Sequence, residues 1–227
     1  MTIKDWPLDE RPRGKPLAKG AEALSDAELL AILLRSGYAK QTAVDLARQL
    51  LAECGGVAGL RQARYQDFSQ IKGLGLSHFV AVQAGIALAN RALLSPIKKR
   101  HAVDNIAATR AFLLSQLNFE VREVFWGLFL DSQYRVIASQ ALFYGTLNQA
   151  SVYPREVLNA CLHHHAAALI VAHNHPSGIL SPSQADIDIT LQLRQALALV
   201  DIELLDHIVV AGGKTLSLAE TGHFYPS

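Results

Sequence analysis

The chain has 227 residues, and half of them are hydrophobic, which suits one medium-sized domain or a small domain joined to a medium one. No uninterrupted apolar run reaches about eighteen residues and the first residues carry no hydrophobic signal segment, so we expect neither a membrane span nor secretion. Cys54 and Cys161 are too few and too far apart for a disulfide framework. These features together predict a cytoplasmic protein.

The small net charge of +1 hides an uneven distribution along the chain. Residues 1–100 hold fifteen Lys and Arg against nine Asp and Glu, a charge of +6, whereas residues 101–227 hold six against eleven, a charge of −5. A basic half and an acidic half suggest two units with different partners. An ordinary solvated surface explains the basic half equally well, because a binding patch requires charges that cluster in space.

The N-terminal half carries helix signals only. Ser25 and Glu28 form a capping box that opens a helix, Thr42 begins a second, and a third is expected from about Ser77 to Leu93. The segment 95–100 combines a proline with a basic triplet and indicates a linker. We therefore expect a helical domain at residues 1–98 and a second domain at residues 99–227.

A short hairpin, Ile71-Lys72-Gly73-Leu74-Gly75, separates two of these helical stretches. It resembles the helix-hairpin-helix module, in which backbone N–H groups at the start of the second helix hold a nucleic-acid phosphate. Lys72, Gly73 and Gly75 are accordingly candidate DNA contacts that would read no base sequence. A plain connector between helices is the alternative, because the motif is short.

The C-terminal half alternates between helix and strand signals. We expect an α/β unit with a mixed sheet flanked by helices. The predicted elements are a helix at 107–117, an antiparallel pair of strands at 124–130 and 135–143, a helix at 154–162, a strand at 166–172, a helix from 183, a strand near 202–205 and a hairpin of 207–210 with 215–218.

The apolar strand at 166–172 runs directly into His173-Asn174-His175. Side chains two apart on a strand point the same way, so His173 and His175 should project together while Asn174 faces the opposite side. The Pro and Gly that follow turn the chain away. The two imidazoles are therefore a chelating pair.

Ser183 is placed as the N-cap of the next helix, with Asp186 three residues on. A capping box alone would explain this pair. Asp186, however, continues the apolar stripe of its helix, so its carboxylate should face inward and needs a cation or several hydrogen-bond donors. His173, His175 and Asp186 therefore predict a zinc site with three protein ligands and an open position, one ion per chain, with a polar corner between strand and helix as the alternative.

The spacing His-x-His, seven residues, Ser-x-x-Asp resembles the pattern of the JAMM (MPN-plus) metalloproteases. The wider run, from Pro154-Arg155-Glu156 to Leu204-Leu205-Asp206-His207, is similar to the bacterial RadC-like proteins, which carry a JAMM domain behind a helical region and were historically linked to DNA repair. The resemblance implies a JAMM/MPN-like fold. It also implies a catalytic Glu, matched here by Glu123, with Glu120 and Glu156 as competitors, and an oxyanion role for Ser183.

These observations favour a zinc hydrolase that cleaves an amide or isopeptide bond in a protein or peptide. His207 would orient one of the metal ligands. A DNA-associated repair protein or metal-dependent nuclease is the first alternative, motivated by the basic half and the hairpin. The second is an interaction module without catalysis, whose metal is structural or missing.

Overall fold

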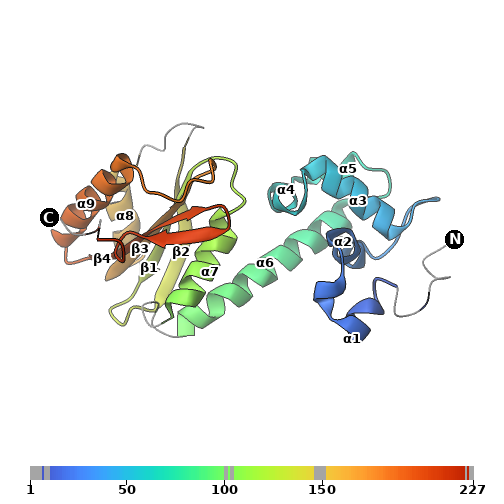
Figure 1. Ribbon diagram of the computed structural model, residues 1–227, viewed down its shortest axis with the longest axis horizontal. Helices are drawn as coiled ribbons and strands as arrows, with labels where there is room; N and C mark the ends of the chain where they lie inside the picture. The colour runs from blue at the N-terminus through green and yellow to red at the C-terminus, as the bar shows by residue number, and fades with distance from the viewer. Residues whose placement is uncertain are drawn as a thin grey trace. The chain divides into compact units, whose positions relative to one another are not determined.

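The computed structural model describes residues 7, 11–99, 102, 105–145, 152–222 and 224. The chain folds as two compact units that divide between Ala89 and Asn90 (Figure 1). Each unit is built around hydrophobic side chains of its own.

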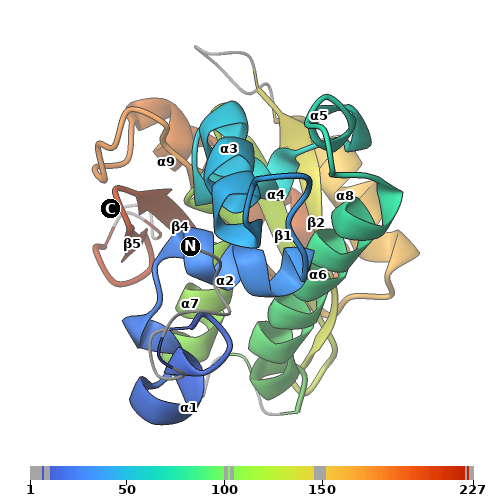
Figure 2. The ribbon, with the colours of Figure 1, turned by 90° about the vertical axis from the view of Figure 1, so that its right-hand side faces the viewer.

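The first unit is helical, as Figure 2 shows. Ser25 and Thr42 cap its two central helices through capping boxes with Glu28 and Asp45, and Gly55 ends the second of them in the left-handed conformation at φ 74°. The helices are α1 (Lys15–Lys19), the short 3₁₀ helix η2 (Ala21–Ala23), α2 (Asp26–Leu34), α3 (Ala43–Cys54), α4 (Val57–Gln62), α5 (Tyr65–Ser69) and the start of α6 (Leu76–Lys99). Their core includes Leu34, Leu46, Leu50, Phe68 and Val82.

Helix α6 corrects the predicted linker, because it continues through Pro96 to Lys99. Arg100, the last residue of that predicted segment, lies outside the described residues. A proline inside a helix costs about 3 kcal/mol, since it removes one backbone hydrogen bond and crowds the preceding turn. Ile97 is completely buried in the second unit, and burial of such a side chain contributes about 1.5–3 kcal/mol. Burial of Ile97 therefore offsets the free-energy cost of Pro96, and the helix continues where the sequence pattern indicated a linker.

Helix α6 also contains a segment of membrane length, although it holds no uninterrupted apolar run of eighteen residues. By length and composition alone, Leu76–Ile97, with a mean hydropathy of 1.3, is long and apolar enough to cross a membrane, and 11% of its most apolar window is buried. Polar residues interrupt the stretch, so no uninterrupted run revealed it. Val82 and Ile97 of this helix are buried in the cores of the first and second unit respectively, as in a helix shared by two folded units.

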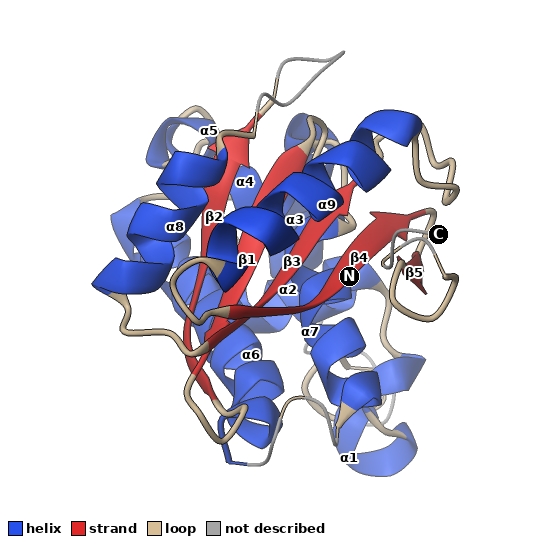
Figure 3. Ribbon diagram, turned by 90° about the vertical axis from the view of Figure 1, so that its left-hand side faces the viewer, coloured by secondary structure: helices blue, strands red, loops and turns tan. Residues whose placement is uncertain are grey.

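The second unit is a mixed five-stranded sheet with the strand order β2-β1-β3-β4-β5, covered by helices on both faces (Figure 3). One face packs against α7 and the end of α6, and the other against α8 and α9. This arrangement confirms the predicted α/β class. The elements are α7 (Ile106–Leu117), β1 (Val124–Leu130), β2 (Val136–Tyr144), α8 (Pro154–His163), β3 (Ala168–Asn174), α9 (Gln184–Ala198), β4 (Glu203–Ala211) and β5 (Lys214–Ser217).

Strand β4 differs from the prediction, because the expected break between 205 and 207 does not exist. The register with β3 shifts between Leu169 and Ile170, which pair with Leu204 and Asp206, so Leu205 is an extra residue in β4. Such an irregularity interrupts the alternation of inward and outward side chains, and the sequence pattern therefore looked like a strand end. Its consequence is that His207 faces α9 and the end of β3.

Candidate metal centre

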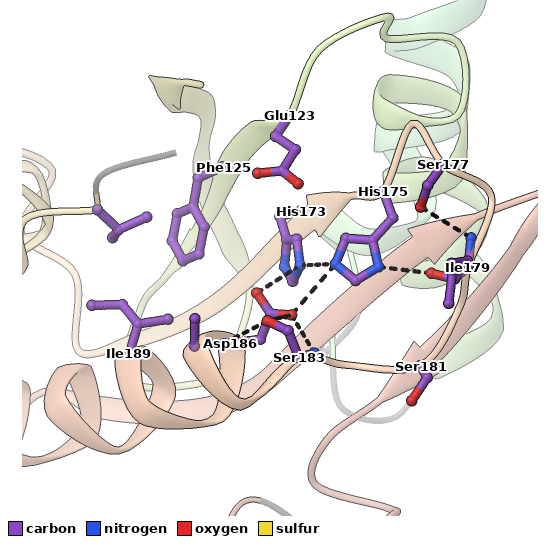
Figure 4. Close-up of a pocket in the computed structure, with 12 residues that line it drawn as sticks. Glu123, Phe125, His173, His175, Ser177, Ile179, Ser181, Ser183, Asp186 and Ile189 are labelled. Atoms are coloured by element: carbon purple, nitrogen blue, oxygen red, sulfur yellow. Dashed lines mark hydrogen bonds and ion pairs between the residues drawn. The ribbon is translucent and has the colours of Figure 1, made fainter. Parts of the chain in front are cut away.

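The end of β3 is held by strands on both sides, β1 antiparallel and β4 parallel, and all seven of its residues are buried. His173 is its second-to-last residue, and the backbone N–H of His175, just beyond the strand, donates to the carbonyl of Val210 on β4 at 2.9 Å. The two histidines therefore start from a fixed backbone. Figure 4 shows their imidazole rings side by side, as the alternation along a strand predicts.

Asn174, between the two histidines, points the other way and anchors the segment before β1. Its Oδ1 accepts from the backbone N–H of Val124 at 2.8 Å, and its Nδ2 donates to the carbonyls of Glu120 and Arg122 at 3.1 and 3.0 Å. These bonds fix the backbone on both sides of Glu123. The sequence indicated the direction of Asn174 but not this positioning role.

Asp186 on α9 both caps its helix and faces the histidines. Its Oδ2 accepts from the backbone N–H and the hydroxyl of Ser183, each at 2.7 Å, which completes the capping box. Its Oδ1 lies 3.1 Å from Nε2 of His173, and its Oδ2 lies 3.4 Å from Nε2 of His175. Asp186 can therefore cap its helix through Oδ2 and offer Oδ1 to a metal ion, so the capping box and the metal ligand are compatible.

Hydrogen bonds also assign the protons of His175. Its Nδ1 lies 2.7 Å from the carbonyl oxygen of Ile179, which can only accept, so Nδ1 carries a hydrogen. The Nε2 atom of His175 then has its lone pair free and lies 2.8 Å from Nε2 of His173.

His173 is oriented by a buried chain of hydrogen bonds through His207 and Thr190. The Thr190 hydroxyl donates to the carbonyl of Asp186 at 2.5 Å, so it accepts from Nδ1 of His207, also at 2.5 Å. Nε2 of His207 is then an acceptor for Nδ1 of His173 at 2.8 Å. The lone pair on Nε2 of His173 is thereby directed towards His175 and Asp186.

These three atoms fit a metal ion. Nε2 of His173, Nε2 of His175 and a carboxylate oxygen of Asp186 lie within 4.8 Å of one another. Ligands of a tetrahedral zinc ion, each about 2.0–2.1 Å from it, are about 3.3 Å apart, close to the separations here. The two Nε2 atoms lie 2.8 Å apart, so either a proton or a metal ion lies between them. His173, His175 and Asp186 could therefore hold a metal ion.

The charges of the site favour the same conclusion. Burial opposes ionisation of Asp186, but its interactions with the His173 and His175 imidazoles and the hydrogen bond from Ser183 hold its pKa well below the ordinary value. Asp186 in turn raises the pKa of His175 against the effect of burial, with help from the Ile179 carbonyl. The site therefore attracts positive charge, which a proton supplies when no metal is bound. Complete burial holds the pKa of His207 far below its usual value, so His207 is neutral, as its hydrogen bonds require.

The three groups open into a cavity of about 610 Å³. Glu123 lines this cavity, and Figure 4 shows its carboxylate above the two imidazole rings. Among the described lining residues, Asp186 is the other carboxylate. Glu156 instead pairs with Arg155 at 3.2 Å, and Glu120 gives its carbonyl to Asn174. Of the three candidate catalytic acids, the structure brings Glu123 to the cavity.

Ser183 also lines the cavity, but its hydroxyl hydrogen is already used. The hydroxyl donates to Oδ2 of Asp186 and accepts from the backbone N–H of Asp186 at 3.2 Å. An oxyanion would have to compete with Asp186 for that hydrogen. Ser183 therefore lies beside the metal ligands, and its hydroxyl is engaged in capping α9.

The candidate DNA contacts lie in the other unit, in the turn between α5 and α6. Lys72 is exposed, and Gly73 has φ 97° with a backbone so close to Tyr38 that a side chain would collide with its ring. The N–H of Gly75 donates to Nδ1 of His78 at 3.1 Å, so this amide has an acceptor within the protein.

Residues 103–223 match the family model described as RadC-like JAB domain, and residues 3–80 match the model described as UPF0758 N-terminal. The chain belongs to the RadC-like JAB domain family. It is 52% identical over 222 residues to a UPF0758 protein of Azotobacter vinelandii, a match that covers 98% of this chain and 99% of the relative. The UPF0758 proteins of Ectopseudomonas mendocina and Nitrosospira multiformis are 50% and 52% identical over the same shares.

These matches confirm the resemblance to RadC-like proteins. The name UPF0758 states no activity. Membership of a JAB family together with the His173–His175–Asp186 group points to a metal-dependent hydrolase.

Proposed function

We propose that this protein is a zinc-dependent hydrolase of amide bonds, a metallopeptidase or isopeptidase that binds one zinc ion per chain. The observation that carries the proposal is the arrangement of the three ligand atoms. Every other polar atom of their side chains has a protein partner, and Nε2 of His173, Nε2 of His175 and Oδ1 of Asp186 remain directed at a common point. Two imidazole nitrogens and one carboxylate oxygen are a donor set that zinc accepts in open catalytic sites.

Zinc in such a site supplies a Lewis acid and lowers the pKa of a coordinated water to about 7. Glu123 supplies the proton transfer: its carboxylate takes a proton from water and returns it to the leaving amine. The bonds from Asn174 to the backbone on both sides of Glu123 support this role, because they hold the carboxylate at the cavity. Ser183 keeps Asp186 in place and would turn its hydroxyl towards an oxyanion only by giving up one of two bonds to Oδ2.

We also propose a cytoplasmic location and a protein or peptide substrate. Support for the location comes from Cys54 and Cys161, both free thiols among the described residues, which suit a reducing compartment.

The proposal is tested with the purified full chain, its metal content and hydrolysis of a panel of peptide and isopeptide bonds. His175→Ala should lose zinc, because it removes one of three ligands. Glu123→Gln should keep zinc and lose hydrolysis, because an amide cannot accept the proton. Glu156→Gln is the matched control and should retain both. Hydrolysis at the original rate by Glu123→Gln would contradict the mechanism, and DNA cleavage by the zinc-loaded protein would favour the nuclease alternative.

For the helical unit we propose DNA contact through Lys72 and the backbone at Gly73. The exposed position of Lys72 at a tight turn supports this partner. Gly75 contributes less, because its N–H already has an acceptor. The test is the DNA affinity of the full chain with Lys72→Ala. An affinity equal to that of the unchanged protein would place the DNA contact elsewhere.

A further inference from the structure

We infer that the substrate places an apolar side chain beside the metal ligands, in a pocket formed by Phe125, Val152 and Ile189. We call this the apolar pocket. The inference rests on the proposed function and adds the chemical class of the residue next to the hydrolysed bond. All three side chains line the same cavity as His173, His175 and Asp186.

The apolar pocket is attached to the elements that carry the ligands. Phe125 pairs with His173 in the register of β1 and β3, and the two rings stack with centroids 6.2 Å apart and planes 15° from parallel. Ile189 follows Asp186 by three residues on α9, which places it on the same face of the helix. A group bound at the ligand atoms therefore has apolar walls beside it.

The two ends of the cavity differ in chemistry. Figure 4 shows Phe125 and Ile189 on one side of the ligand group, and Ser177, Ile179 and Ser181 on the opposite side, so that the first side is apolar and the second mixed. The ionisable lining residues among those described, Glu123, His173, His175 and Asp186, are the groups of the metal centre itself. The apolar end thus offers no charged partner among the described lining residues.

A substrate side chain at the apolar end would lose water there. An aliphatic side chain gains free energy from that loss, whereas a carboxylate loses hydration and finds no lysine or arginine among the described lining residues. Ile189 and Val152 are only partly buried, so they still have surface to cover. Phe125 is 2% exposed and forms the floor of the pocket.

Binding of amino-acid hydroxamates to the zinc-loaded full chain tests this inference. The hydroxamate group binds zinc, so N-acetylglycine hydroxamate reports the metal site alone and the N-acetyl-leucine and N-acetyl-aspartate analogues report the pocket. We expect the leucine compound to bind about tenfold tighter than the glycine compound, and the aspartate compound to bind no tighter. Zinc content is measured on the same samples.

Ile189→Gln should reduce the preference for leucine over glycine by several-fold, measured as the ratio of the two affinities in the same protein. Val152→Ser provides the same comparison should Ile189→Gln not fold. Leu199→Gln, at an exposed position just beyond the same helix, is the matched control and should retain the full preference. Equal affinities for the leucine and aspartate compounds would contradict the apolar pocket and leave the metal site unaffected. A zinc-loaded protein that binds no hydroxamate would contradict the open metal site and the proposed function with it.

Discussion

The two units differ in what they bury. The described core of the helical unit consists of hydrophobic side chains, whereas every buried polar side chain among the described residues lies in the second unit. Four of these, His173, Asn174, Thr190 and His207, belong to the metal centre, and each has hydrogen-bond partners. Burial of polar groups costs free energy unless they are paired. The hydrogen bonds among these four residues therefore allow the second unit to bury polar side chains at the metal centre.

Metal removal should show the largest contrast between the units. Free zinc at a thousand times its Kd should stabilise the second unit by about 4 kcal/mol, because the metal binds only the folded site. Hydrogen exchange measured with and without a chelator should slow in β3 and α9 when zinc is bound. Equal slowing in α2 and α3 would show that the two units do not respond separately.

Loss of the Thr190 hydroxyl should weaken zinc binding about 10–100-fold, as expected for groups that orient metal ligands. In Thr190→Val, the Nδ1 hydrogen of buried His207 has no acceptor, which costs about 1–3 kcal/mol and releases the orientation of His173. Thr190→Ser keeps the hydroxyl and should restore most of the affinity. Titration calorimetry of zinc binding to the three proteins measures both effects. Wild-type affinity in Thr190→Val would show that the buried chain does not orient the ligand.

Asn174→Ala should separate metal binding from hydrolysis. It removes the bonds to Val124, Glu120 and Arg122, so Glu123 loses its fixed backbone while the three ligand atoms keep theirs. We expect zinc content near wild type and hydrolysis reduced by about tenfold or more. A variant that hydrolyses at the original rate would show that Glu123 needs no such support.

Zinc affinity should fall as the pH is lowered. Asp186 raises the pKa of His175 above its usual value, so in the metal-free fold the protonated imidazole is stabilised below that pKa and this contribution is lost as the pH rises through it. Zinc requires the deprotonated nitrogen and must displace the proton. The affinity should therefore rise with pH through the raised pKa and level off above it. An affinity independent of pH in that range would contradict the exchange of proton for metal.

Lys72→Ala should give the smallest effect, on DNA affinity alone. Loss of one phosphate contact should lower the slope of log affinity against log salt by about 1, for all DNA sequences alike. Lys214→Ala in the second unit is the control and should leave the slope unchanged. An unchanged slope in Lys72→Ala would remove the one specific contact proposed for the helical unit.

The sequence predicted the fold class, the capping box of α2, the start of α3 at Thr42, and the convergence of His173, His175 and Asp186, because each depends on local spacing. It missed three features that depend on neighbours distant in the chain. Burial of Ile97 carries α6 through Pro96, Leu205 is an extra residue within a continuous β4, and Thr190 completes the hydrogen-bond chain. The orienting role expected for His207 agrees with its hydrogen bond to His173. A threonine within an amphipathic helix gives no local sign of such a role.

X-ray absorption at the zinc edge of the purified full chain tests the central claim most directly. The account predicts one zinc ion per chain with two imidazole nitrogens and one or two oxygen ligands at about 2.0–2.1 Å, and no sulfur. It further predicts that His175→Ala abolishes this signal. Sulfur ligands at about 2.3 Å, or an unchanged spectrum in His175→Ala, would contradict a metal centre built from His173, His175 and Asp186.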